Sequence, residues 1–111
     1  MAIDDVNIVD GLAVDAKKGT LYLLLTDHLP WEGEETLAER DHLLLLQEKI
    51  NAYVSFIEGE QYKSNYPNVI IKTVIIEIHF QYEISENCQR FLQAVQGQLE
   101  QYAIQIQAQI G

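Results

Sequence analysis

The strongest hydrophobic pattern in the chain runs through residues 41–58 and predicts a long helix. At about 100° per residue, one stripe of this helix collects Leu43, Leu46, Ile50, Tyr53, Val54 and Ile57. A stripe of this width is typical of a helix that lies on a sheet. Leu44 and Leu45 point away from the stripe. We therefore expect a loop of the same chain or a second subunit to cover them.

Two strands are predicted before this helix. Residues 5–15 have strand composition, with a bend expected at Asp10-Gly11 because glycine inside a strand favours a bulge or kink. Residues 16–19 form a short polar turn that ends in glycine, and residues 20–26 resume as a strand, so the pair predicts a hairpin. The second strand is apolar on both faces, which indicates a central position in the sheet.

The connection into the helix passes Pro30, which cannot continue a central strand. Thr36 and Glu39 have the spacing of a capping box, so the helix is expected to start near residue 36. Gly59 follows the last apolar residue of the stripe and is predicted to end the helix in the left-handed conformation.

The second half of the chain predicts a strand, a helix and a final strand. Residues 69–83 alternate as one long strand, and residues 104–110 alternate isoleucine or alanine with glutamine. Ser85 is expected to cap the helix between them. The apolar stripe of that helix consists of Cys88, Phe91, Leu92, Val95, Leu99 and Tyr102.

The predicted order is β-β-α-β-α-β, which gives a single α+β domain over residues 1–111. It is a two-layer sandwich with one four-stranded mixed sheet and two helices on one face. If both helices return along the sheet, crossover handedness makes strands two, three and four parallel and strand one antiparallel, and it leaves strand order open. The other sheet face is either solvent-exposed or half of a homodimer. We favour the homodimer, with a dimer face of Ile71, Thr73, Ile75 and His79.

Charge narrows the range of partners. Seventeen acidic residues against seven basic ones give a net charge of −10, which argues against nucleic acid and anionic membranes. Residues 1–60 carry most of this charge, either to keep the surface solvated or to dock a basic protein partner. No apolar segment approaches the roughly 20 residues that span a bilayer. The single cysteine, Cys88, falls on an apolar stripe and is interpreted as a core residue in a cytoplasmic protein.

Two Asp-His pairs are the candidates for chemistry. Asp27-His28 and Asp41-His42 lie on either side of the strand-to-helix connection, so their side chains could converge on one polar or metal site. Successive strand residues point to opposite faces, however, and no zinc-protease or phosphate-loop motif is present. The alternative is that His28 is hydrogen-bonded in the loop and His42 is packed at the stripe's edge. We therefore predict no metal, no cofactor and no catalytic residue, with an enzyme as the rival interpretation.

The segment 27–41 is the candidate interaction surface. It combines apolar side chains with acids, which suits a basic partner, and its members are Leu29, Trp31, Glu32, Glu34, Glu35 and Asp41, together with Leu44 and Leu45. The alternative, which we favour, is that Leu29 and Trp31 fold over Leu44 and Leu45 as a lid.

The same residues resemble a family of small bacterial proteins of unknown function. The matching motifs are Asp-His-Leu-x-Trp at residues 27–31 and Asp-His-Leu-Leu-Leu-Leu-Gln-Glu-Lys-Ile-Asn-x-Tyr at residues 41–53. The likeness covers most of the chain except the glutamine-rich end. It implies no particular activity or cofactor.

The functional hypothesis from sequence is a small, acidic, cytoplasmic protein that acts as a homodimer through protein–protein contacts. One concrete form is an antagonist of a basic partner, such as an immunity protein for a toxin. The alternative is a metal-assisted or small-ligand enzyme that uses His28, His42 and neighbouring carboxylates.

Overall fold

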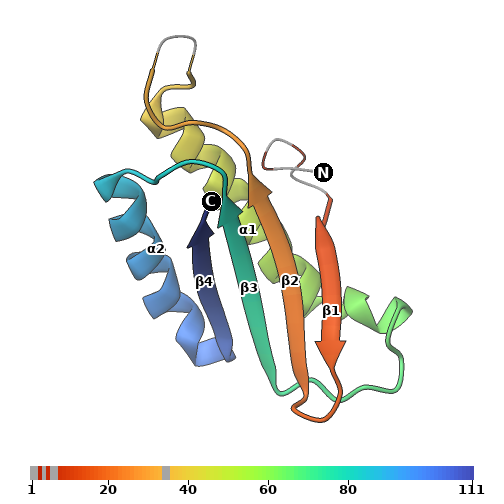
Figure 1. Cartoon of the computed structure of the whole chain (residues 1–111). Helices are drawn as coiled ribbons and strands as arrows, with labels where there is room; N and C mark the ends of the chain where they lie inside the picture. The colour runs from red at the N-terminus through yellow and green to blue at the C-terminus, as the bar shows by residue number, and fades with distance from the viewer. Residues whose placement is uncertain (1–2, 4, 6–7, 34–35) are drawn as a thin grey trace.

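The computed structural model describes residues 3, 5, 8–33 and 36–111, and these form an α+β fold (Figure 1). The element order is β-β-α-β-α-β, as predicted, with two short 3-10 turns added. The elements are β1 (Gly11–Asp15), β2 (Thr20–Asp27), α1 (Glu39–Glu58), η1 (Gln61–Ser64), β3 (Thr73–Phe80), α2 (Glu86–Leu99), η2 (Glu100–Tyr102) and β4 (Ile104–Ile110).

The four strands form one mixed sheet in the order β1-β2-β3-β4. β1 pairs antiparallel with β2, and β2, β3 and β4 are parallel. The predicted directions are confirmed, and the strand order, which the sequence left open, follows the chain. The carboxyl ends of β2 and β3 therefore lie side by side, with Asp27 opposite Phe80.

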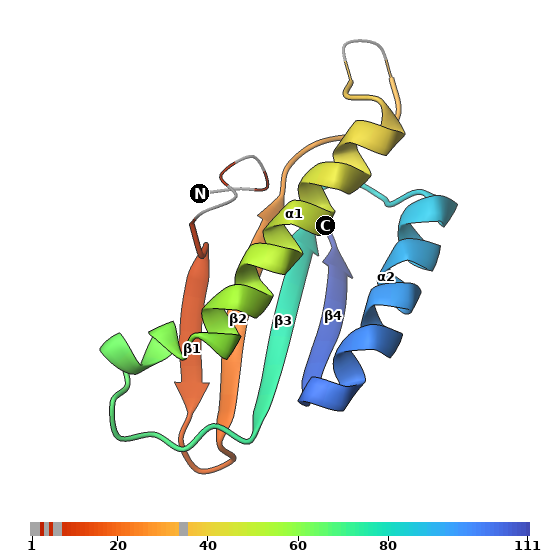
Figure 2. The same ribbon diagram turned by 180° about the vertical axis from the view of Figure 1, so that it is seen from behind.

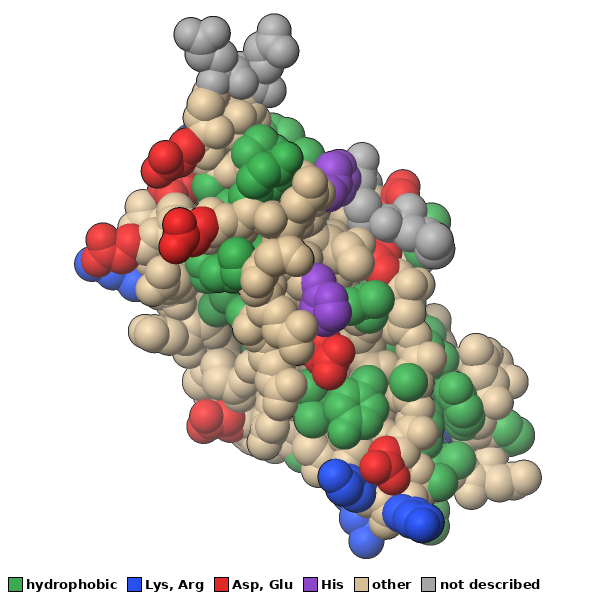
Figure 3. Space-filling view, in the orientation of Figure 1, with side chains coloured by type: hydrophobic (Ala, Val, Ile, Leu, Met, Phe, Trp, Pro, Cys, Tyr) green, Lys and Arg blue, Asp and Glu red, His purple; other side chains and the backbone are tan. Residues whose placement is uncertain are grey.

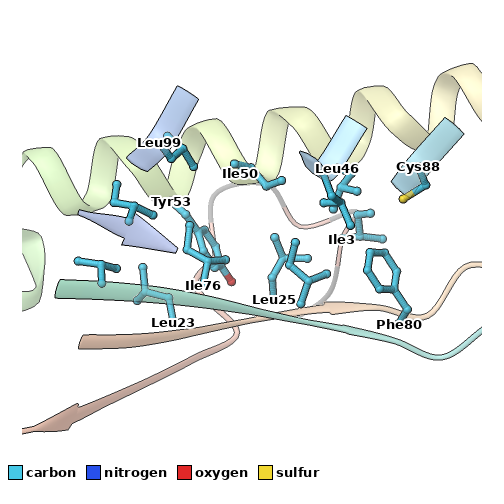
Figure 4. Close-up of a cluster of buried hydrophobic side chains, with 14 of the residues drawn as sticks. Ile3, Leu23, Leu25, Leu46, Ile50, Tyr53, Ile76, Phe80, Cys88 and Leu99 are labelled. Carbon is cyan, nitrogen blue, oxygen red and sulfur yellow. The ribbon is translucent and has the colours of Figure 1, made fainter. Parts of the chain in front are cut away.

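Both helices pack on one face of the sheet, and the core lies between the two layers (Figures 2 and 4). Leu21, Leu23 and Leu25 of β2 are fully buried there, as expected for the central strand. Their register partners on β3 are also buried, which extends the apolar floor beneath α1. The two periodicities that predicted these elements therefore meet in one core.

No helix of the described residues lies over the opposite face of the sheet (Figure 1). Apolar, acidic and histidine side chains are mixed on this side of the molecule (Figure 3). Thr73, Ile75 and His79 are half-buried and pair with Thr20, Tyr22 and Thr26 in the register of β2. Ile71, the fourth residue of the predicted dimer face, precedes β3 and packs against the core instead.

The first strand is shorter than the predicted bent strand over 5–15. β1 begins at Gly11. Just before it, the side chain of Asp10 takes the place of a backbone carbonyl in the pairing with β2. Oδ2 of Asp10 accepts a hydrogen bond of 2.8 Å from the backbone N–H of Thr26. A polar side chain therefore ends the strand pairing where we predicted a kink within it.

The predicted caps of α1 are wrong. The helix begins at Glu39 after Ala38, with no side-chain cap, and the hydroxyl of Thr36 donates to the Glu32 carbonyl instead. At the other end Gly59 is right-handed (φ −77°), and the left-handed residue is Glu60 (φ 54°). The cap of α2 is confirmed, because Ser85 Oγ accepts from the Cys88 N–H at 3.1 Å.

Three apolar side chains of the predicted alternating and helical patterns lie at the margins of the core. β3 spans 73–80 rather than 69–83, matching the length of β2, so Ile70 is 78% exposed. Tyr102 leaves the stripe of α2 for η2 and is exposed, as is Ile110 at the end of β4. The apolar pattern in the sequence extends beyond the residues that pair with neighbouring strands. Side chains beyond the paired residues, such as that of Ile70, are no longer covered by the helices and remain exposed.

The covering expected over Leu44 is absent among the described residues, where this side chain is 46% exposed. Leu45 is half-buried and packs against the core. Trp31 and Leu29 also join the core, but the ring that Trp31 contacts is that of His42. The lid interpretation is therefore wrong for Leu44, which stays exposed, because Trp31 is buried over the ring of His42 instead.

Candidate functional site

Asp27 and His42 form a buried pair at the carboxyl end of β2. His42 Nε2 lies 2.6 Å from Asp27 Oδ2, and neither side chain is exposed. The other carboxylate oxygen of Asp27 accepts from the Leu29 N–H at 3.0 Å. Because a carboxylate accepts, Nε2 of His42 carries the shared proton, which fixes the tautomer and orientation of the ring.

Trp31 closes the pair from the outside. Its ring stacks on His42 with centroids 3.5 Å apart and an interplanar angle of 13°, and it also lies against Phe80. Two buried polar atoms here, Trp31 Nε1 and His42 Nδ1, have no hydrogen-bond partner among the described residues. Buried polar atoms are rarely left this way.

The two Asp-His pairs do not converge as a four-residue site. Asp27 faces the core, and the following residue, His28, which lies just beyond the end of β2, is exposed. On α1, His42 faces the sheet and Asp41 is exposed, about 100° away around the helix. Each dipeptide therefore contributes one residue to the interior and one to solvent, and the polar site predicted from all four is wrong.

A histidine held by a carboxylate is the arrangement of a general base. That chemistry requires the free ring nitrogen to reach a substrate atom. In this protein the ring is 0% exposed and lies under an indole. The geometry therefore favours a structural pair that joins α1 to the end of β2.

A surface hollow of about 270 Å³ lies next to Trp31, where the loop after β2 meets the loop after β3. Its walls are Pro30, Trp31 and Glu32 on one side and Tyr82, Glu83, Ile84 and Ser85 on the other. Glu32, Tyr82 and Glu83 are exposed, and no Lys or Arg is among the described residues that line it. The hollow therefore combines carboxylates with aromatic rings.

Only two described residues of the predicted interaction surface line this hollow. Trp31 and Glu32 line it, whereas Leu29 is half-buried in the core. Glu34 and Glu35 lie outside the described residues. Sequence analysis missed Tyr82 and Glu83 as lining residues, because it placed them at the end of the predicted strand 69–83. Their position just before the Ser85 cap was the one sign that they lie close to a loop.

Sequence reasoning missed a second buried pair. Lys49 Nζ lies 2.8 Å from Asp10 Oδ1, with side chains 0% and 2% exposed. A signal for it existed, because Lys49 falls seven residues after His42 on the same buried face of α1. A lysine inside an apolar stripe needs a carboxylate partner.

Tyr53 completes this second cluster. Its hydroxyl donates to the Leu24 carbonyl at 2.5 Å and accepts from the Asp10 N–H at 2.9 Å. Burial raises the pKa of Tyr53 well above its ordinary value, so the hydroxyl stays protonated at neutral pH. Tyr53, Asp10 and Lys49 therefore tie α1 to the start of β1.

Cys88 is fully buried, in agreement with its interpretation as a core residue. Burial raises the pKa of the thiol to about 12, and the carboxylates of Asp27 and Glu39 act in the same direction. Nucleophilic cysteines need a lowered pKa and access to solvent. Cys88 has neither property.

The described residues hold no group of three or more His, Cys, Asp or Glu side chains that could bind a metal ion. In the same part of the chain, α1 and α2 are too polar or too short to cross a bilayer.

At the start of α1, Glu39 accepts from the Asn87 side chain at 2.8 Å. Hydrogen bonds from Ser85 and Asn87 lower the pKa of Glu39, so its charge is satisfied within the chain.

Comparisons with known proteins give one match. No curated protein and no solved structure is similar enough to be assigned as a relative. The family model of DUF6572, a family of unknown function, matches residues 1–111. The chain therefore belongs to DUF6572.

Proposed function

We propose that this protein is a protein–protein interaction module that binds a basic partner at the carboxyl end of its sheet. The supporting observation is the hollow between the loops after β2 and β3, where Glu32 and Glu83 lie beside Trp31 and Tyr82. Carboxylates pair with guanidinium or ammonium groups, and aromatic faces attract the same cations. An arginine or lysine side chain is the ligand that suits both.

The position of the hollow supports this proposal. Ligand sites in sheets with parallel strands form outside the carboxyl ends, where successive loops separate. The net charge of −10 would steer a basic protein toward the molecule before contact. An acidic antagonist of a basic protein, such as an immunity protein, is one form of this function.

The enzyme alternative has less support. His28 is exposed, and His42 is buried under Trp31 with its Nε2 on Asp27. A catalytic role for His42 would require Trp31 to move away first. We therefore do not propose a reaction.

We also propose that the chain associates with a second copy of itself. The two candidate interfaces are the open sheet face around Ile75 and the edge of the sheet at β4. The cytoplasm is the proposed compartment, since a single cysteine leaves the chain without an internal disulfide.

The basic-partner proposal is tested by titrating the protein with a short arginine-rich peptide. Trp31 is the single tryptophan and lines the hollow, so its fluorescence reports binding directly. We expect Glu32→Gln combined with Glu83→Gln to weaken binding about three- to tenfold, because each exposed carboxylate contributes up to about 1 kcal/mol.

The matched control removes the same charge elsewhere, with Glu48→Gln and Glu58→Gln on the exposed side of α1. Net charge alone would make both double variants weaken binding equally. That result, or no fluorescence change with any arginine-rich peptide, would count against the hollow as the binding site.

A further inference from the structure

The last strand is an edge strand that carries no charge. β4 lies at one edge of the sheet, and its sequence Ile-Gln-Ile-Gln-Ala-Gln-Ile contains neither a charged residue nor a proline. Natural edge strands are commonly protected by lysine, proline, a bulge or short length. A regular neutral edge of seven residues, in a chain of net charge −10, lacks these protections.

The backbone direction of each β4 residue follows from its hydrogen bonds. The Ala103 carbonyl accepts from Val74 at 3.0 Å, and the Gly111 N–H donates to Phe80 at 2.9 Å. Odd-numbered residues therefore face β3. Because strand groups alternate, the N–H and C=O groups of even-numbered residues point outward from the sheet.

One side chain of α2 occupies the first part of this edge. Gln96 Nε2 donates to the Ile104 carbonyl at 3.2 Å, and Gln96 Oε1 accepts from the Ile106 N–H at 2.6 Å. The next outward groups are the Ile106 carbonyl, both backbone groups of Ala108, and the Ile110 N–H. No described residue hydrogen-bonds to these four groups.

We propose that β4 pairs antiparallel with β4 of a second copy, centred on Ala108. In this register the two Ala108 residues exchange both hydrogen bonds, and the Ile110 N–H of each copy donates to the Ile106 carbonyl of the other. The Ile106 carbonyl, both backbone groups of Ala108 and the Ile110 N–H of each chain are then hydrogen-bonded. The two four-stranded sheets join into one sheet around a two-fold axis.

A groove next to the edge fits the side chains of the second copy. It has a volume of about 340 Å³, and its walls are Leu92, Gln93, Gln96, Gly97, Glu100, Ile106 and Ala108. The pairing places the partner's Ile110 opposite Ile106, on the helix side of the sheet. Ile110 is 53% exposed in the single chain, so each copy supplies both an uncovered apolar side chain and a groove for it.

Charge favours a second copy over a charged partner at this surface. Two chains of net charge −10 repel each other, so their contact is favoured where charged side chains are few. β4 carries no charge, and Glu100 is the one charged residue among the described residues that line the groove. On the open face of the pairing, Gln107 would lie opposite the partner's Gln109, which places neutral amides together. This inference rests on the self-association proposed above and identifies its surface.

The test combines sedimentation equilibrium with two single variants. Ala108→Pro removes an outward N–H and leaves the bonds to β3 intact, so we expect a folded monomer. Ile75→Lys places a charge on the open sheet face, the rival interface, and is expected to remain a dimer. Circular dichroism confirms that both variants are folded.

Hydrogen exchange of the unmodified protein gives a second, independent readout. In a dimer the amides of Ala108 and Ile110 exchange slowly and become fast on dilution, whereas Ile106 stays protected by Gln96 at every concentration. Slow exchange with a monomeric Ala108→Pro variant supports the inference.

Two other outcomes separate its failure from failure of the wider proposal. The edge pairing is overturned, and self-association retained, if the protein is a dimer in which the amides of Ala108 and Ile110 exchange fast. The same conclusion follows if the dimer is lost with Ile75→Lys but kept with Ala108→Pro. A chain that is monomeric at all concentrations overturns both.

Discussion

At the scale of single residues, four buried polar side chains hold α1 to the sheet. His42 bonds to Asp27, and Lys49 bonds to Asp10, each pair joining the helix to the β1–β2 hairpin region. Buried charges are costly unless they are paired and hydrogen-bonded. These pairs therefore specify the position of the helix along the sheet more than they add to stability.

Lys49→Met tests this view of the second pair. The variant leaves the Asp10 carboxylate buried without the ammonium group, so we expect the free energy of unfolding to fall by about 3 kcal/mol in urea titrations. Glu48→Gln, an exposed neighbour on the same helix, should change it by less than about 0.5 kcal/mol.

Adding Asp10→Asn to Lys49→Met should restore part of the lost stability. The amide oxygen of asparagine can still accept from Thr26, and the unpaired charge is gone. A double variant that is less stable than Lys49→Met alone would mean that Asp10 acts through contacts other than this pair.

The two Asp-His pairs indicated where a polar site was possible, but they did not predict which of their side chains come into contact. Alternation along β2 predicts that Asp27 and His28 diverge, and the helical repeat predicts the same for Asp41 and His42. Which member of each pair turns inward depends on the packing of α1 over β2. The stacking of Trp31 on His42 comes from a loop whose path has no periodic signal.

At the scale of elements, periodicity predicted both α-helices and the four strands of the described residues but misplaced several of their ends. α1 begins three residues later than the capping box indicates, and β3 is shorter at both ends. Periodicity reports which face is buried, whereas an element's end depends on what its neighbours can pair with. β3 stops where β2 and β4 stop.

The two predicted caps differ in outcome, and mutation can measure the difference. Ser85 accepts from the Cys88 N–H, so Ser85→Ala should destabilise the protein by about 1 kcal/mol. Thr36 only donates to a loop carbonyl, so Thr36→Ala should cost less than about 0.5 kcal/mol in the same urea titrations. A loss of less than about 0.5 kcal/mol for Ser85→Ala as well would indicate that Ser85 Oγ contributes nothing as a cap.

At the scale of the whole molecule, charge separates the two proposed contacts. The hollow is lined by carboxylates, and the β4 edge is neutral. Salt screens attraction to a basic partner and equally screens repulsion between two acidic copies. The two associations should therefore respond to salt in opposite directions.

We expect added sodium chloride to weaken binding of the arginine-rich peptide and to strengthen self-association. Fluorescence titration and sedimentation equilibrium on the same protein measure the two effects. Self-association that weakens with salt would indicate an interface held by ion pairs, which the β4 edge cannot supply.

The amino-acid pattern alone was enough to predict the element order, the buried face of Leu21, Leu23 and Leu25, the parallel directions of β2 to β4, and the acidic character of the molecule. Each of these depends on local periodicity, chain handedness or composition. The tertiary packing brings Asp27 to His42 and Asp10 to Lys49, and it places Gln96 over the first part of the β4 edge. Those contacts join residues far apart along the chain or on different elements, and no local pattern encodes the distance between them.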